Sequence, residues 1–135
     1  MPVSFFDTNV LVYIASGDAT KADQAEAMID GGGTISVQVL NELANVARRK
    51  MRMPWSETRA LLSAVRDLLT VQPVTVATHD AGLALAERYN LSTYDAIIAA
   101  SALAADCDTL WSEAMRHGMT IEGRLRIVNP FRTSR

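Results

Sequence analysis

Three acidic residues, far apart in the sequence, have the surroundings of ligands for a hard metal ion. Asp7 ends a short apolar run, Glu42 flanks an apolar helical stripe, and Asp95 stands at the start of a very apolar segment. Clustered carboxylates repel one another unless a cation neutralises them, and oxygen ligands without nearby thiolate or imidazole select Mg²⁺ or Mn²⁺. Such a site can activate water for in-line attack on a phosphodiester. The three acids predict metal-dependent hydrolysis if the fold brings them together.

Each acid also has a structural interpretation when it is taken alone. Asp7 could cap the helix that follows it, and Asp95 could be the third helical residue of a capping box opened by Ser92. Glu42 is harder to explain in this way, because a glutamate beside an apolar stripe is partly buried and needs a partner. The functional interpretation therefore depends on whether the elements converge.

Short apolar strands alternate with helical patterns along most of the chain. Strands are expected at 3–6, 34–36, 71–76, 109–111, 119–121 and 125–128, and helices at 8–15, 20–30, 37–49, 55–69, 78–89 and 96–105. This alternation predicts a single α/β domain over residues 1–135, with a central, mostly parallel sheet of four to five short strands and helices on both faces. Strand ends and first helical turns gather at one edge of such a sheet, which is where the acids are expected to meet.

The bulk composition is that of a globular chain, with 135 residues, 49% hydrophobic and 21% charged. The net charge of -2 gives no overall attraction to nucleic acid, so an RNA contact needs a local basic patch. One candidate patch consists of Arg48, Arg49, Lys50 and Arg52. The same cations also suit a solvated helix end, where they complement the helix dipole.

Compartment and partner surfaces leave weaker signals in the sequence. The single cysteine, Cys107, is expected to be a small buried residue, which fits a reducing cytoplasm. No run approaches the length of a membrane span, so no membrane association is expected. Met51, Met53 and Trp55 suit either the core or contact with a partner protein.

Several segments together resemble a PIN-domain ribonuclease, most of all the toxin half of a VapBC-type toxin-antitoxin pair. They are Phe6-Asp7-Thr8-Asn9-Val10-Leu11, Asn41-Glu42-Leu43, Tyr94-Asp95-Ala96-Ile97-Ile98-Ala99-Ala100 and Cys107-Asp108-Thr109-Leu110-Trp111-Ser112-Glu113 with Gly118. No single motif is specific, but their order and spacing across nearly the whole chain make the set strong.

The resemblance implies an endoribonuclease that cleaves RNA phosphodiesters with Mg²⁺ or Mn²⁺. By this similarity Asp7, Glu42 and Asp95 would bind the metal. Thr8 and Asn9 would arrange the first loop, and Ser112 would lie near the metal without binding it. The resemblance also implies a homodimer and a cognate antitoxin that covers the acidic pocket and adjacent apolar grooves.

The chain departs from the family pattern at Ala114, where a further Asp or Asn often occurs. The adjacent Glu113 is a candidate fourth catalytic acid in its place. The departure also motivates an alternative, a catalytically impaired PIN scaffold that binds RNA or a protein without cleavage. A phosphotransfer receiver domain is disfavoured, because it would need a lysine late in the chain and none follows Lys50.

Overall fold

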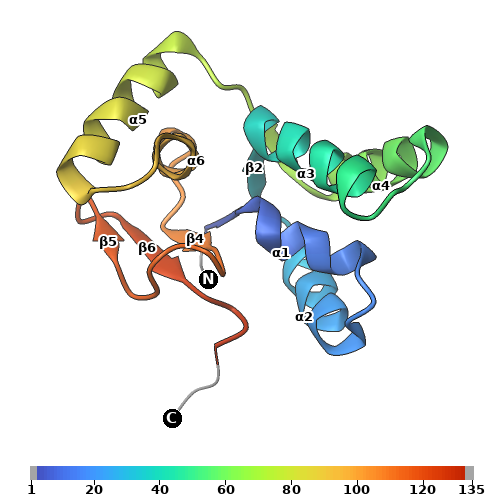
Figure 1. Ribbon diagram of the computed structural model, residues 1–135. Helices are drawn as coiled ribbons and strands as arrows, with labels where there is room; N and C mark the ends of the chain where they lie inside the picture. The colour runs from blue at the N-terminus through green and yellow to red at the C-terminus, as the bar shows by residue number, and fades with distance from the viewer. Residues whose placement is uncertain (1–2, 133–135) are drawn as a thin grey trace.

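A six-stranded sheet runs through the centre of the computed structural model, which describes residues 3–132 (Figure 1). The strands are β1 (Ser4–Phe6), β2 (Thr34–Ser36), β3 (Thr70–Gln72), β4 (Thr109–Trp111), β5 (Thr120–Ile121) and β6 (Leu125–Val128). Their order is β3-β2-β1-β4-β6-β5, and only the β5–β6 pair is antiparallel. The mostly parallel sheet is confirmed, and it reaches six strands because both strands of the C-terminal hairpin join it. The ends of the predicted domain, residues 1–2 and 133–135, lie outside the described residues.

Helices cover the sheet on both sides, as predicted. They are α1 (Thr8–Val12), the 3₁₀ helix η1 (Tyr13–Ala15), α2 (Ala19–Asp30), α3 (Val37–Arg49), α4 (Trp55–Leu68), α5 (Val76–Tyr89) and α6 (Thr93–Ala104). Figure 1 shows α5 and α6 together on one side and α1 to α4 on the other. Among residues 3–132, no helix is both long enough and apolar enough to cross a membrane.

The core forms where the central strands meet α6. The strand side chains Phe5, Ile35, Leu110 and Ile127 are fully buried, and α6 is buried continuously from residue 96 to 102. Helix α5 lies very close to α6, since a Cβ added at Gly82 would stand 2.8 Å from Ile97 Cγ1. The apolar character of α6 is therefore explained by contact with the sheet on one side and α5 on the other.

Two predicted boundaries around β3 and α5 are wrong. The strand expected at 71–76 ends at Gln72, because Pro73 has no N–H to continue the ladder. Helix α5 then begins at Val76 rather than after Thr78, since Thr75 is its N-cap and accepts a hydrogen bond from Thr78 N at 3.1 Å. Thr78 is buried inside the first turn instead of capping it.

The carboxyl edge of β1 is the point where the sheet changes direction. From β1 the chain runs to β2 and β3 on one side, and it returns through β4 to the other side. Ligands of open α/β sheets bind at such a switch point, in the crevice outside the carboxyl ends of the strands. Asp7, Glu42 and Ser112 all follow strands that end here.

Candidate active site

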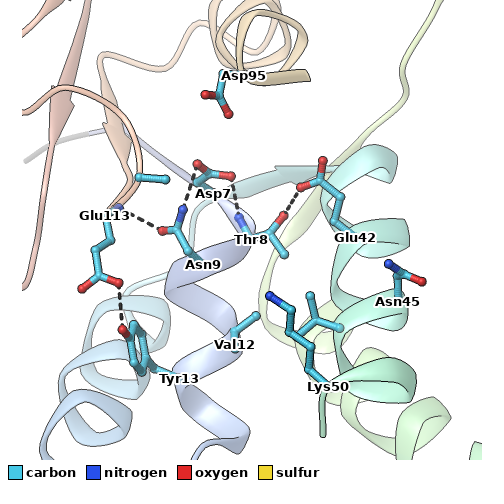
Figure 2. A pocket seen from close by; sticks show the side chains of 12 residues that line it. Asp7, Thr8, Asn9, Val12, Tyr13, Glu42, Asn45, Lys50, Asp95 and Glu113 are labelled. Carbon is cyan, nitrogen blue, oxygen red and sulfur yellow. Dashed lines mark hydrogen bonds between the residues drawn. The ribbon is translucent and has the colours of Figure 1, made fainter. Parts of the chain in front are cut away.

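A pocket of about 490 Å³ opens at the carboxyl edge of β1 and collects the three predicted acids (Figure 2). Asp7 comes from the end of β1, Glu42 from the second turn of α3, and Asp95 from the first turn of α6. The other lining residues are Thr8, Asn9, Val12, Tyr13, Asn45, Val46, Lys50, Glu113 and Ala114. The convergence expected from the parallel topology is therefore present.

Asp7 is the most deeply buried of the acids, with only 4% of its surface exposed. It is the N-cap of α1, and its Oδ1 accepts a hydrogen bond from Thr8 N at 2.7 Å. Its Oδ2 accepts from Ser112 Oγ at 2.8 Å and from Asn9 Nδ2 at 3.2 Å. The pairing of Phe6 with Trp111 brings Ser112 beside Asp7. The capping and functional interpretations of Asp7 are thus compatible.

The electrostatic environment of Asp7 works against its ionised form. Burial raises the pKa of the Asp7 carboxyl above its ordinary value, and the nearby charges of Asp95 and Glu42 raise it further. Hydrogen bonds from Ser112 and Thr8 oppose this rise in pKa without overcoming it. A cation in the pocket would neutralise the repulsion among the three carboxylates, so the electrostatics of the site favour binding of a cation.

Glu42 is held at the pocket by one residue on each side. Thr8 Oγ1 donates a hydrogen bond to Glu42 Oε1 at 2.6 Å, and Gln38 Nε2 donates to Glu42 Oε2 at 3.1 Å. Gln38 lies one helical turn earlier on α3, so the second bond fixes the side chain along its own helix. The Thr8 bond joins the loop after β1 to α3.

Asp95 faces Asp7 from across the pocket in Figure 2. It is the third residue of α6, and its backbone N donates to the N-cap Ser92 Oγ at 3.2 Å. Within residues 3–132 its carboxylate has no hydrogen-bond partner. Ser92 caps α6 as predicted, but Asp95 does not complete the capping box, and its carboxylate stays available to a ligand.

Glu113 lines the pocket, but its carboxylate turns away from Asp7 (Figure 2). Its Oε1 accepts from the Tyr13 hydroxyl at 2.7 Å and its Oε2 accepts from Lys21 Nζ at 2.9 Å. Partial burial acts to raise the pKa of Glu113, but the bonds from Lys21 and Tyr13 outweigh it and lower the pKa. The Glu113 backbone N meanwhile donates to Asn9 Oδ1 at 2.9 Å and so orients the Asn9 amide toward Asp7.

The donor set fits a hard divalent cation bound partly through water. Among the described residues, no three His, Cys, Asp or Glu side chains are close enough to enclose an ion directly. Mg²⁺ keeps several waters and uses only one or two carboxylates, so a wider acid cluster suits it. The polar lining of the pocket consists of carboxylates, amides, two hydroxyls and one ammonium but neither histidine nor cysteine, which excludes a typical zinc site.

The four residues of the predicted basic patch lie in different surroundings. Arg48 donates to the Met53 carbonyl at 2.7 Å, and its guanidinium carbon lies 4.2 Å from the centre of the Trp55 ring. Lys50 alone of the four lines the pocket, and Figure 2 shows its side chain directed toward the acids. Arg49 and Arg52 are exposed outside the pocket.

Four pocket residues were not singled out from the sequence. Asn45 and Val46 follow Glu42 at helical spacing, as Val12 and Tyr13 follow Asn9, so each pair shares a helix face with a predicted residue. This periodicity was the signal that could have identified them.

Solved structures with the same fold include proteins of toxin-antitoxin systems. A toxin-antitoxin complex from Klebsiella pneumoniae matches at a TM-score of 0.72 and 23% identity, covering 96% of this chain and 99% of that chain. VapC20 from Mycobacterium tuberculosis, a toxin that cleaves the sarcin-ricin loop, matches at a TM-score of 0.65 and 15% identity, covering 81% of this chain and 88% of that chain. VapBC2 from Rickettsia felis, bound to a promoter DNA fragment, matches at a TM-score of 0.59 and 21% identity, covering 81% of this chain and 86% of that chain.

Sequence comparison assigns the family. No curated protein matches this chain. The model of the PIN domain family matches residues 4–114, which include β1, the three acids and Glu113. With most of the chain matched and the acids gathered at one pocket, this protein belongs to the PIN-domain family.

Proposed function

We propose that this protein is an endoribonuclease that uses Mg²⁺ or Mn²⁺ and acts as the toxin of a toxin-antitoxin pair. The observation that carries the proposal is the convergence of Asp7, Glu42 and Asp95 on one pocket of a PIN domain. RNA as substrate is supported by the similarity to VapC20, whose target is the sarcin-ricin loop. An antitoxin partner is supported by the similarity to the Klebsiella toxin-antitoxin complex.

In this proposal Asp7, Glu42 and Asp95 hold the metal either directly or through water, and Asp7 is the most buried of the three. A bound Mg²⁺ or Mn²⁺ supplies a nucleophile from water and neutralises charge that develops on the phosphate. Thr8 fixes Glu42, while Asn9 and Ser112 fix Asp7, so the carboxylates keep their positions when the substrate arrives. Such positioning of metal ligands typically contributes 10- to 100-fold in affinity or activity.

Lys50 is the residue of the basic patch best placed to contact an RNA phosphate, because it lines the acid pocket. Its positive charge offsets the local acidity that would repel the RNA backbone. Arg49 and Arg52 are exposed nearby and are proposed as further backbone contacts. Arg48 contributes indirectly, because its bonds hold the chain at Met53 and Trp55.

The proposed antitoxin covers the pocket and the apolar residues beside it. Trp55 is 59% exposed although it carries a large apolar ring, and the half-buried Met51 and Met53 lie beside it in the chain. Exposed apolar side chains of this kind are common anchors in protein interfaces. A homodimer is proposed on the family resemblance, and a cytoplasmic location is proposed because Cys107 is a free, buried thiol.

A PIN scaffold without cleavage activity is the second candidate. Two observations favour it: Ala114 stands at the pocket in place of an acid, and the Glu113 carboxylate is engaged by Lys21 and Tyr13. Such a protein would bind RNA or its partner through the same surface.

Cleavage of a mixed RNA pool by purified protein separates the two candidates. The assay compares Mg²⁺, Mn²⁺ and EDTA, with Asp7→Ala as the matched variant. The nuclease predicts cleavage that requires a divalent metal and disappears in the variant. Intact RNA under both metals, with folded and partner-free protein, would favour the scaffold, and Ala114→Asp would then be tested for restored cleavage.

A further inference from the structure

A second groove, of about 540 Å³, adjoins the acid pocket along α3. Its lining residues are Val37, Gln38, Asn41, Glu42, Asn45, Val74 and Tyr94. Glu42 and Asn45 line both this groove and the acid pocket, so the two hollows lie side by side. A chain whose reacting phosphate lies at the acids can therefore extend along this groove.

Tyr94 provides an aromatic surface in the lining of the groove. It is 68% exposed and immediately precedes Asp95 on α6. Its backbone carbonyl accepts from Gln38 Nε2 at 3.1 Å, which ties this end of α6 to α3. A large exposed ring on a fixed backbone suits stacking with a nucleobase.

Apart from Glu42, which the groove shares with the acid pocket, the remaining polar lining consists of uncharged amides. Asn41 and Asn45 are one helical turn apart on α3, and within residues 3–132 neither side chain has a hydrogen-bond partner. An amide offers both donors and an acceptor, as the edge of a base does. No Lys or Arg lines the groove, so it lacks the cations that hold phosphates.

We propose that this groove binds an unpaired nucleobase of the RNA next to the scissile phosphate. The base stacks on Tyr94, and the Asn41 and Asn45 amides hydrogen bond with its edge. The inference rests on the proposed ribonuclease function and adds to it a source of sequence preference around the cleavage site.

The first test measures stacking without cleavage. Short single-stranded RNAs with one 2-aminopurine are titrated with protein and Mg²⁺ in an Asp7→Asn background, which keeps the RNA intact. Quenching of the fluorescence reports stacking of that base. Tyr94→Ala is expected to remove the quenching and weaken binding about fivefold or more, while Tyr94→Phe retains both. Leu83→Ala is the matched control, since Leu83 is an exposed apolar residue that does not line the groove.

The second test measures specificity with active protein. Cleavage positions in a randomised RNA pool are compared for wild type, Asn41→Ala and Tyr94→Ala, after thermal melting has confirmed that each variant is folded. The variants are expected to lose a preference for one base beside the cut. A single abasic site at that position is expected to slow the wild type as much as Tyr94→Ala slows cleavage of intact RNA.

The outcomes separate this inference from the function on which it rests. Equal quenching and unchanged cut-site preference in Tyr94→Ala would overturn the groove assignment and leave the surface to a protein partner, while metal-dependent cleavage would still stand. Absence of any cleavage by the wild type would instead contradict the ribonuclease, and the fluorescence titration would still decide whether the groove binds a base.

Discussion

The Tyr13 hydroxyl holds the Glu113 carboxylate at 2.7 Å, on the side of the pocket away from Asp7 (Figure 2). Lys21 binds the other oxygen of the same carboxylate, so Glu113 would have to leave two partners to reach a metal. We therefore expect Glu113→Gln to lower RNA cleavage by less than about tenfold. Asp7→Asn should lower it by more than about 100-fold, since even the partners of metal ligands contribute 10- to 100-fold.

Single-turnover cleavage rates of these two variants measure the difference. Tyr13→Phe is the matched control, because it removes the hydroxyl that restrains Glu113 and leaves the carboxylate in place. If Glu113→Gln is as inactive as Asp7→Asn, Glu113 acts directly in catalysis, as the sequence suggested.

The raised pKa of Asp7 predicts how the stability of the metal-free protein depends on pH. The folded-state pKa lies above the ordinary value of 3.8, so the contribution of Asp7 to stability is present below that value and is lost as pH rises through the raised pKa. Asp7→Asn cannot ionise. Its free energy of unfolding, relative to wild type, should therefore increase as the pH rises above the ordinary value of 3.8.

Urea unfolding in EDTA at several pH values tests this difference. The difference between the unfolding free energies of wild type and Asp7→Asn cancels the opposite trend of Glu113 and Glu122, which both proteins share. The lowered pKa values of these two glutamates favour stability at higher pH. Saturating Mg²⁺ should stabilise wild type and not Asp7→Asn, since the cation favours the ionised carboxylate. A pH-independent difference would contradict the electrostatic picture of the pocket.

The contrast between Lys50 and Arg48 predicts different effects on RNA binding. Lys50→Ala should weaken binding of single-stranded RNA and reduce the slope of log K against log salt by about 0.7, the value for one phosphate contact. Arg48→Ala should instead lower stability, because it removes the bond to the Met53 carbonyl and the contact with Trp55. Titrations at several salt concentrations, with urea unfolding of both variants, distinguish the effects. An unchanged salt slope in Lys50→Ala would remove this residue from the RNA interface.

Gly82 affects the site indirectly, because its lack of a side chain allows α5 to pack closely on α6. An alanine Cβ there would lie 3.2 Å from Ile97 Cα, which is backbone and cannot rotate away. Overpacking of this kind costs about 1–3 kcal/mol, and part of it is offset by better helix propensity. Gly82→Ala should thus lower the free energy of unfolding and also lower activity, because Asp95 is carried by α6. Gly17→Ala is the control, since a Cβ there meets nothing within 4 Å.

The convergence of the acids was predictable because it follows from topology. Asp7 and Glu42 come to the carboxyl edge because they follow the parallel strands β1 and β2, and Asp95 comes there because it begins α6, the helix that leads back to the parallel strand β4. The boundaries near Pro73 were less predictable, because Thr75 and Thr78 are both good N-caps and only the chain path decides between them.

Side-chain direction in the site could not be read from the sequence. The orientation of Glu113 depends on Tyr13 and Lys21, which lie about a hundred residues away in the chain. Likewise, the four basic residues between positions 48 and 52 give no sign that Lys50 enters the pocket while Arg48 packs on Trp55. These contacts arise from tertiary packing, which sequence periodicity does not encode.

We propose that the acid pocket cleaves RNA with the help of a divalent metal. The most direct test of this proposal is the cleavage rate of a single defined RNA by protein stripped with EDTA and then titrated with Mg²⁺ or Mn²⁺, for wild type, Asp7→Asn and Asp95→Asn. We expect no cleavage without metal, saturable recovery of cleavage in wild type, and a cleavage rate lowered by more than about 100-fold in Asp7→Asn. Cleavage that persists in EDTA, or equal rates for wild type and both variants, would contradict it.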